Sequence, residues 1–178
     1  YKRQIHVVFK DDSESAGSYS VFHCRSTDRG LTYSTAVKVA DGAYTPITLT
    51  STINFPAMAI DAAGILYVAW IGVETGATTR RVLVSKSVNG GGSFTTPVAV
   101  SPADQISSSF PQIAVSRNGV LLVTYMDGSR LFKVGSTDGG RTFTGSTRIP
   151  NNDVSVSSAG GPVAFDARGV GYIVYGTS

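Results

Sequence analysis

The octet Ser136-Thr137-Asp138-Gly139-Gly140-Arg141-Thr142-Phe143 occurs in two further versions, STDRGLTY at residues 26–33 and SVNGGGSF at residues 87–94. An Asp or Asn side chain can hydrogen-bond the backbone two residues ahead, and Gly adopts positive φ without steric cost. Each octet stands between two short apolar runs. The pattern therefore predicts three tight turns, each of which closes a β-hairpin.

The three octets keep the same residue types at the same positions. The repeated Ser, Asp or Asn, Gly and aromatic residues are Ser26, Asp28, Gly30 and Tyr33; Ser87, Asn89, Gly91 and Phe94; Ser136, Asp138, Gly140 and Phe143. Val39, Val100 and Ile149 each lie six residues past the aromatic residue. This constant spacing predicts that every octet joins two antiparallel strands in the same register.

A second repeated unit lies between the octets, at residues 55–70, 110–125 and 161–175. Each copy reads as a strand, a short turn that ends in Gly, and a second strand. The first strand is apolar on both faces, as expected of a strand buried between neighbouring sheets. The run Gln4–Phe9 matches the second strand alone. The repeat thus has four strands, A to D, with the octet between C and D, and the chain is predicted to contain thirteen strands.

Four antiparallel strands in roughly 50 residues are typical of one blade of a β-propeller. We predict an all-β propeller domain with about three and a half blades, at residues 1–42, 53–102, 108–150 and, in part, 159–178. Propellers typically close with four to eight blades, and an open arc exposes sheet faces and strand edges. We therefore expect either a part of a longer chain or a homo-oligomer, in which two copies make about six blades.

The composition agrees with this fold and argues against several functions. The 178 residues are 42% hydrophobic and 15% charged, with 20 Gly, a balance that favours an all-β protein. Basic residues are scattered, with Arg80-Arg81 as the longest run, so we expect no nucleic-acid partner. No apolar run approaches 18 residues, so no membrane span is expected. The spacing of metal ligands and phosphate loops is missing, so we expect no metal and no cofactor. The start at Tyr1, without Met or a signal peptide, suggests a processed chain or a fragment.

The octets resemble the Asp boxes of the bacterial neuraminidase repeat (BNR) and sialidase superfamily, and the resemblance covers nearly the whole chain. In that superfamily the boxes are structural and lie on the C–D turns at the rim, away from the substrate. The resemblance thus implies that Asp28, Asn89 and Asp138 are fold markers. Asn89 agrees with this role, because an amide can form the same turn but is a poor acid. The resemblance also implies a secreted or cell-surface protein.

Function in a propeller is expected on the opposite face, which the B–C and D–A loops form. Arginine suits an acidic sugar because its planar fork binds a carboxylate in a bidentate manner, and aromatic rings can stack on sugars. The candidate substrate-binding residues on this face are Arg81, Arg130, Asp127, Glu74, Trp70 and Tyr125. The alternative interpretation is a solvated strand end for the arginines, which we favour, and packing between blades for the aromatic residues.

The resemblance implies a catalytic set of clustered arginines, a Tyr nucleophile paired with Glu, and an Asp acid/base. The Phe-Arg-Ile-Pro motif of that family is missing, and Phe55-Pro56 and Phe110-Pro111 carry no Arg. We therefore assign no catalytic residue. We expect a non-catalytic propeller that binds carbohydrate or acts as a scaffold. The alternatives are a sialidase-like glycoside hydrolase, completed by missing blades or a second chain, and a protein-binding propeller.

Overall fold

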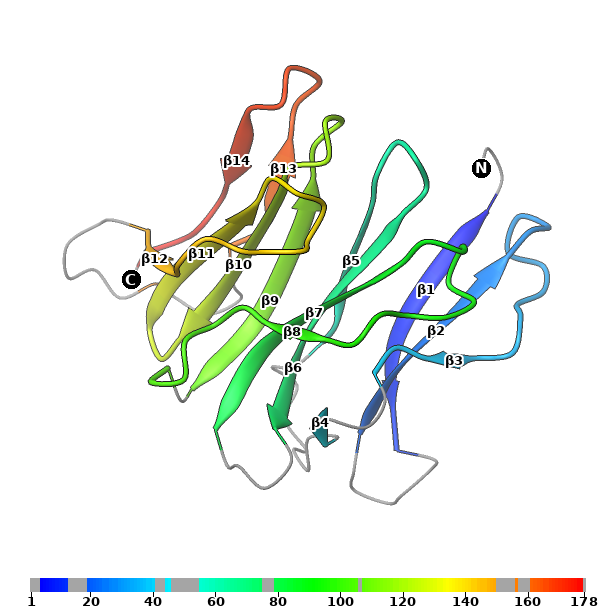
Figure 1. The fold of residues 1–178 in the computed structure, drawn as a ribbon, viewed down its shortest axis with the longest axis horizontal. Helices are drawn as coiled ribbons and strands as arrows, with labels where there is room; N and C mark the ends of the chain where they lie inside the picture. Colours follow the sequence, from blue (N-terminus) through cyan, green and yellow to red (C-terminus); the bar gives the residue numbers. More distant parts are fainter. Residues whose placement is uncertain are drawn as a thin grey trace.

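The strands of this chain form antiparallel sheets (Figure 1). The computed structural model describes residues 4–12, 19–40, 44–45, 55–74, 79–105, 107–149, 156 and 161–177. The strands are rich in Val, Ile, Phe and Tyr, which pack well on a pleated surface. Within the described ranges, no helix is long and apolar enough to cross a membrane.

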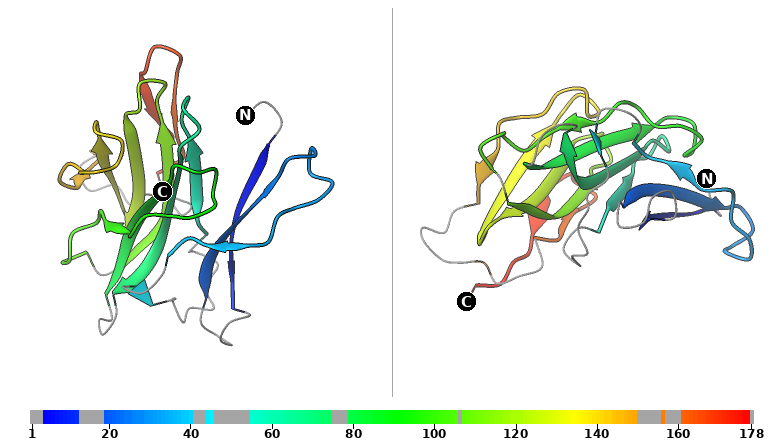
Figure 2. Two further views of the ribbon diagram at one scale, coloured as in Figure 1. Left: turned by 45° about the vertical axis from the view of Figure 1, so that its right-hand side comes forward. Right: turned by 90° about the horizontal axis from the view of Figure 1, so that it is seen from below.

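The strands make three sheets and one separate hairpin. The first sheet consists of β1 (Ile5–Asp11), β2 (Ser20–Ser26) and β3 (Val37–Lys38). The second consists of β4 (Tyr44–Thr45), β5 (Ala57–Ile60), β6 (Leu66–Glu74), β7 (Arg80–Ser87) and β8 (Val98–Ala99). The third consists of β9 (Ser108–Val115), β10 (Leu121–Asp127), β11 (Arg130–Ser136) and β12 (Thr147–Arg148). The hairpin is β13 (Val163–Phe165) and β14 (Gly171–Ile173). The sheets follow one another in chain order in all views (Figures 1 and 2).

The predicted four-strand repeat is confirmed, and the predicted number of strands is wrong. β9 to β12 pair in chain order, which is the expected A-to-D meander. The described residues hold fourteen strands, because β4 lies in a segment that we had predicted to be a D–A loop. Tyr44 pairs with Glu74 at one end of β6, while β5 pairs with the other end. Two short strands therefore share the position of strand A in the second sheet.

The A strands are not all buried, contrary to the expectation from their apolar faces. Most of β9 is buried, whereas β5 and β13 are half-buried or exposed along their length. The cause is their place in the fold, because β9 packs between β5 and β13. Only β9 has a neighbouring strand of another repeat on each side in the described structure.

Two apolar clusters hold the sheets together. The larger lies between the second and third sheets and includes Tyr67, Val84, Leu121 and Tyr125. The smaller lies between the first and second sheets, and its buried members are Val21, Val39, Val68, Trp70 and Leu83. Burial of apolar area stabilises a fold by about 25 cal/mol per Å². These two clusters therefore contribute to the stability of the contacts between the repeats.

The three octets fold into the same hydrogen-bonded turn. In the third octet, Ser136 Oγ donates to Asp138 Oδ1 at 2.8 Å and accepts from the Gly140 N–H at 2.9 Å. Asp138 Oδ1 accepts from the Thr142 N–H at 3.0 Å. The first and second octets repeat all three bonds at equivalent atoms. The fourth and fifth positions have positive φ in every copy, including Arg29 at 67°.

The strands that follow the octets keep one register, as the spacing predicted. The N–H groups of Val39, Val100 and Ile149 donate to the carbonyls of Val21, Val82 and Leu131 at 2.8 to 2.9 Å. Each of these bonds ties the residue six positions past the octet aromatic to the C strand. The octet turn and the register of the strand that follows it thus recur together in all three copies.

A basic residue of one sheet binds the octet of the next sheet. Arg25 Nη1 donates to the Gly90 carbonyl at 3.2 Å, and Lys86 Nζ donates to the Gly139 carbonyl at 2.7 Å. Arg25 and Lys86 both directly precede the Ser of their own octet, and both acceptors occupy the fourth octet position. Gly135 holds the corresponding place in the third sheet. The contact between sheets therefore repeats once and is lost at the third sheet.

Candidate functional site

The two ends of the sheets carry different kinds of turn (Figure 1). β2, β7 and β11 run towards the upper end in Figure 1, where the octets follow them. The turns that join β9 to β10 and β13 to β14 lie at the same end. β6 and β10 end at the lower end, where β7 and β11 begin. The candidate residues from the sequence therefore lie at or near the end opposite the octets.

Arg81 is held by the backbone of its own repeat. Its Nε donates to the Ser101 carbonyl at 2.8 Å, and its Nη2 also donates to this oxygen. Ser101 Oγ accepts from the Val82 N–H at 2.9 Å. The guanidinium thus fixes the segment that leaves β8.

Tyr125 and Asp127 lie close together at the end of β10. The Tyr125 hydroxyl donates to Gln105 Oε1 at 2.7 Å and lies 2.6 Å from Ser146 Oγ. Asp127 Oδ1 accepts from the Ser107 N–H at 2.8 Å. Burial is the main cause that raises the pKa of Tyr125 to about 12, while the Ser146 hydrogen bond acts to lower it and the charge of Asp127 acts to raise it. The phenol stays protonated at neutral pH and acts as an internal hydrogen-bonding group.

The backbone opposite Tyr125 is strained. The register between β9 and β10 shifts between Thr124 and Met126, so that Phe110 and Pro111 together face Tyr125. Phe110 has φ of 48°, which bulky side chains rarely adopt. Such bulges re-aim side chains near the ends of sheets, and this one accompanies the burial of the Tyr125 ring. The sequence predicted Phe110-Pro111 as the start of a strand and gave no sign of this bulge.

Arg130 belongs to a second cluster, which sequence reasoning found only in part. Arg130 is exposed at the start of β11, directly opposite Asp127 in the strand register. It lines a small pocket, about 10 Å³, together with Arg148, Tyr175, Thr177 and apolar neighbours. Neither guanidinium forms an ion pair or hydrogen bond with another described residue. The pocket has room for about one water molecule, so a larger ligand would lie across it.

The structure separates the remaining two candidates from this cluster. Trp70 is 4% exposed and packs between the first and second sheets. Glu74 pairs through its backbone with Tyr44 at the end of β6. Arg81, Tyr125 and Asp127 are thus brought together, Arg130 joins Arg148, and Trp70 lies in the core. The roles of all six residues in ligand binding stay predictions.

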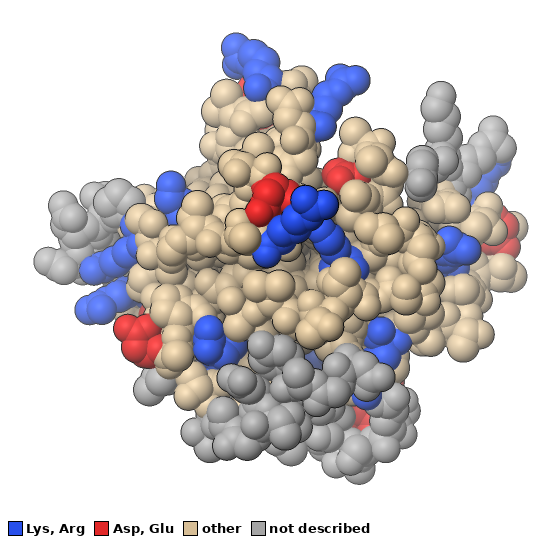
Figure 3. Space-filling model, viewed as in Figure 1, with Lys and Arg blue, Asp and Glu red and all other residues tan. Residues whose placement is uncertain are grey.

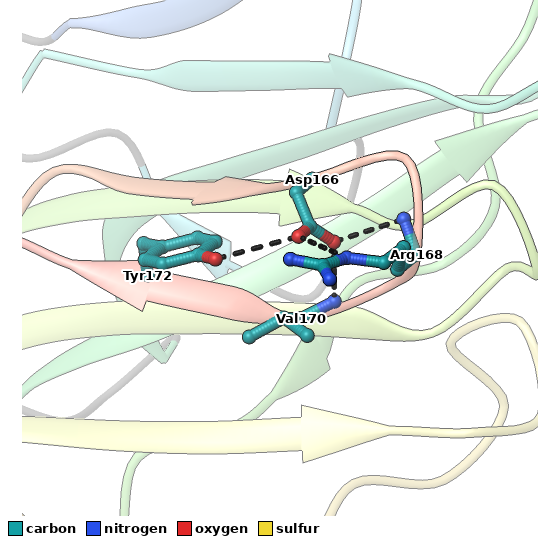
Figure 4. Close-up of polar contacts among 4 residues, drawn as sticks. All are labelled: Asp166, Arg168, Val170 and Tyr172. Atoms are coloured by element: carbon teal, nitrogen blue, oxygen red, sulfur yellow. Dashed lines mark hydrogen bonds and ion pairs between the residues drawn. The ribbon is translucent and has the colours of Figure 1, made fainter.

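Two tyrosine–aspartate pairs lie at the octet end and have a structural role. The Tyr172 hydroxyl donates to Asp166 Oδ2 at 3.3 Å, while Asp166 Oδ1 accepts from the N–H groups of Arg168 and Val170 at 2.9 Å (Figure 4). Asp61 repeats this arrangement in the turn before β6, with Tyr67 as its partner at 3.2 Å. Burial and Asp61 raise the pKa of Tyr67 to about 12. The pairs close turns and do not activate a nucleophile.

The described residues outside this cluster offer no group of metal ligands, and their basic side chains are dispersed on the face shown in Figure 3. Within the described ranges, no three His, Cys, Asp or Glu side chains are grouped to hold a metal ion. Lys and Arg lie in several separate groups on the face shown in Figure 3, with few acidic side chains between them. This distribution leaves the Arg130–Arg148 cluster as the strongest candidate for an anion.

Comparisons with known proteins show the fold. No protein-family model and no curated protein matches the sequence. A Hadza microbial sialidase has a TM-score of 0.57 at 16% identity, over 90% of this chain and 37% of that one. A polysaccharide lyase, PL25 ulvan lyase, has a TM-score of 0.57 at 14% identity, over 98% and 49%. An α-L-arabinanase from Penicillium chrysogenum has a TM-score of 0.54 at 15% identity, over 85% and 43%.

These neighbours are named as a sialidase, a polysaccharide lyase and an arabinanase, and at 14% to 16% identity they show that this chain shares their fold. The chain spans between 37% and 49% of the length of the three proteins. At this identity the similarity concerns the fold, so the ligand has to be argued from the side chains of this chain.

Proposed function

We propose that this chain is part of a sialidase-like Asp-box β-propeller that binds carbohydrate. The three octets are its Asp boxes, and their role is to set the turn and the register of each blade. The identical hydrogen bonds of Ser26, Ser87 and Ser136 support this assignment. Asn89 supports it as well, because its Oδ1 takes the place of a carboxylate oxygen in the turn.

The ligand that the geometry favours is an anionic sugar bound at Arg130 and Arg148. The carrying observation is that Arg130, Arg148 and Tyr175 line one pocket, with no carboxylate bonded to either arginine among the described residues. Guanidinium groups bind carboxylate or sulfate oxygens through two parallel N–H donors, and a tyrosine ring supplies an apolar face for a sugar. The small pocket suits one acidic group, while the rest of the sugar would lie on the surface.

The properties of Tyr125 favour binding over catalysis. A tyrosine nucleophile has to lose its proton readily, whereas burial raises the pKa of Tyr125 and Gln105 accepts its hydrogen bond. A hydrolase would have to draw its nucleophile from elsewhere in a complete propeller. The sugar-active enzymes among the structural neighbours keep the glycoside hydrolase as the second candidate.

A glycan array that contains sialylated, uronate-bearing and neutral glycans tests the proposed function. We expect signal on acidic glycans, which the double variant Arg130→Ala/Arg148→Ala loses. Arg117→Ala is the matched control, since Arg117 is an exposed arginine in the turn before β10, at the octet end. Equal signal on neutral glycans would contradict the proposal. An empty array together with a captured protein partner would favour a protein-binding propeller, and hydrolysis of a sialoside would favour the enzyme.

We also propose that a second copy of the chain covers the open face of the third sheet. Leu122, Lys133, Gly135, Thr144 and Thr147 line a hollow of about 350 Å³ on this face. On the first and second sheets, the following octet covers the corresponding face. The octet at 26–33 of a partner would supply the same kind of turn here. Light scattering should give twice the chain mass of 18.6 kDa; a monomer would favour a further repeat within a longer protein instead.

A further inference from the structure

The two histidines of this chain face each other between the first and second sheets. His6 Nδ1 lies 2.9 Å from His23 Nε2, and the rings stack with centroids 5.2 Å apart. They are the only two histidines among the 178 residues. His6 is on β1 and His23 on β2, two places apart in the strand register on the same face as Arg25. The pair is thus part of the first sheet and points at the second.

His23 is sealed by the octet of the second sheet. It is 1% exposed, its ring meets Phe94 edge-on with centroids 5.6 Å apart, and Gly91 lies directly against it. A Cβ atom at Gly91 would lie 1.9 Å from His23 Cε1. His23 Nδ1 is buried with no hydrogen-bond partner in the described structure. His6 is thus the side-chain partner of this ring.

This short contact can hold one proton but not two. When one ring carries a proton at the shared position, that N–H donates to the bare nitrogen of the other ring. When both rings are imidazolium, two N–H donors would point at each other, which breaks the bond and places two charges in a buried contact. Arg25 on β2 adds a third positive charge nearby. On the octet side, the groups against the pair are Phe94 and the Gly91 backbone, and neither carries a charge. A hydrogen bond with the Gly91 backbone raises the pKa of His23, but burial and the charge of His6 lower it by more.

The titration of the pair follows from this packing. Burial, followed by the charge of His6, lowers the pKa of His23 from 6.5 to about 4. Burial and Arg25 lower the pKa of His6. Since both pKa values are lower in the folded than in the unfolded state, their contribution to stability is complete above pH 6.5. It is lost progressively as the pH falls from 6.5 towards 4.

We propose that the His6–His23 pair makes the contact between the first and second sheets a pH-dependent joint, which acid loosens while the contact between the second and third sheets stays closed. In the second sheet, Tyr67 and Val84 occupy the positions of His6 and His23. Tyr67 packs on the octet glycines Gly139 and Gly140, its hydroxyl donates to Asp61 Oδ2 at 3.2 Å, and no histidine lies at this contact. The joint is thus specific to the first sheet.

Trp70 reports on this joint directly. It is the single tryptophan of the chain, and it is buried in the apolar cluster between the first and second sheets. In the wild type we expect its emission to shift to the red, and its quenching by acrylamide to rise several-fold, between pH 7 and pH 4. The variant His6→Tyr/His23→Val, which copies the second sheet, should keep blue-shifted emission over this range. Hydrogen exchange at pH 4.5 should show lost protection in β2 and retained protection in β10.

A proton NMR titration of the two imidazoles keeps the test independent of how the double variant folds. Because the chain has two histidines, their C2 protons can be assigned with His6→Tyr alone. We expect midpoints below 6.5 for both rings, with that of His23 the lower. Ordinary midpoints near 6.5 for both rings, or the same fluorescence transition in the double variant, would overturn the joint.

Discussion

The first and second sheets meet with the same backbone arrangement as the second and third sheets, but the two contacts differ in their side chains. In each contact, the basic residue that precedes one octet donates to the carbonyl of the fourth residue of the next octet. The donor is Arg25 in the first contact and Lys86 in the second. Behind this bond stand His6 and His23 in the first contact, and Tyr67 with an apolar neighbour in the second. The repeated hydrogen bond therefore sets how neighbouring sheets meet. The residues at the positions of His6 and His23 decide how each contact responds to pH.

A methyl group at the fifth octet position should give the largest difference in stability between the two contacts. Gly91→Ala would place Cβ 1.9 Å from the buried His23 ring, at φ of 85°. Overpacking and left-handed strain together should reduce the free energy of unfolding by about 3 kcal/mol. Gly140→Ala meets Leu121 Cδ1 at 3.1 Å and should cost about half as much. Urea unfolding at pH 7 measures both variants, and equal losses would show that the His23 ring moves aside freely.

Low pH should produce the second-largest difference in stability between the two contacts. The difference between the folded and unfolded pKa of His23 corresponds to about 3 kcal/mol, lost between pH 6.5 and pH 4. Asp28 and Asp138 act in a lower range, because hydrogen bonds from Thr32 and Thr142 lower their pKa values from 3.8, so their contribution is lost only below about pH 4. Urea unfolding of the wild type and of His6→Tyr/His23→Val at pH 7 and pH 4.5 isolates the histidine contribution. A wild type that loses no more stability than the variant would contradict it.

The serine of each octet should matter equally in both contacts. Ser87 and Ser136 are 1% and 3% exposed, and each Oγ accepts from a Gly N–H at 2.9 Å. Ser87→Ala and Ser136→Ala leave this donor unpaired, which should reduce the free energy of unfolding by about 1 to 2 kcal/mol in each case. Thermal unfolding of the two variants measures the effect. A clear inequality would mean that the octets are not equivalent turns.

The basic residues at the two contacts should have the smallest effect. Lys86→Met and Arg25→Met each remove a charge-assisted bond from a side chain that is partly exposed, so each loss should be about 1 kcal/mol or less. Arg117→Met, at an exposed residue in the turn before β10, is the control and should be neutral. Raised salt during urea unfolding should reduce the difference between variant and wild type. If Lys86→Met reduced the free energy of unfolding as much as Gly91→Ala does, the hydrogen bond would contribute as much as the packing, which would contradict this account.

The fold could be predicted from the sequence because its information is local and repeated. Each octet specifies its own turn through a Ser, an Asp or Asn and glycines at φ-positive positions, and the copies confirm one another. β4 was missed because two residues carry no periodic pattern, and β6 creates their pairing from a distance. Exposure of β5 was missed because apolar residues alone do not tell how many neighbours a strand has.

The candidate site was predictable only in part, since it depends on contacts between repeats. Arg130 was identified from its place at the start of a C strand, but Arg148 and Tyr175 reach the same pocket from other segments. The sequence placed Trp70 at the end of a B strand, where a residue could face a ligand, but β6 continues to Glu74 and the first sheet covers Trp70. The histidine pair had no signal in the sequence, because neither residue lies at metal-ligand spacing and the register alone brings the rings together.

One measurement tests most directly whether the octets are structural and the ligand lies at the other end. Amide NMR spectra of the ¹⁵N-labelled chain would be recorded during addition of sialyllactose and of a glucuronate oligosaccharide. We predict shifts that concentrate at residues 129–131, 148–149 and 175–177, and that disappear in Arg130→Ala/Arg148→Ala. Shifts that concentrate at the octets, or spectra that neither acidic sugar changes at millimolar concentration, would contradict this account.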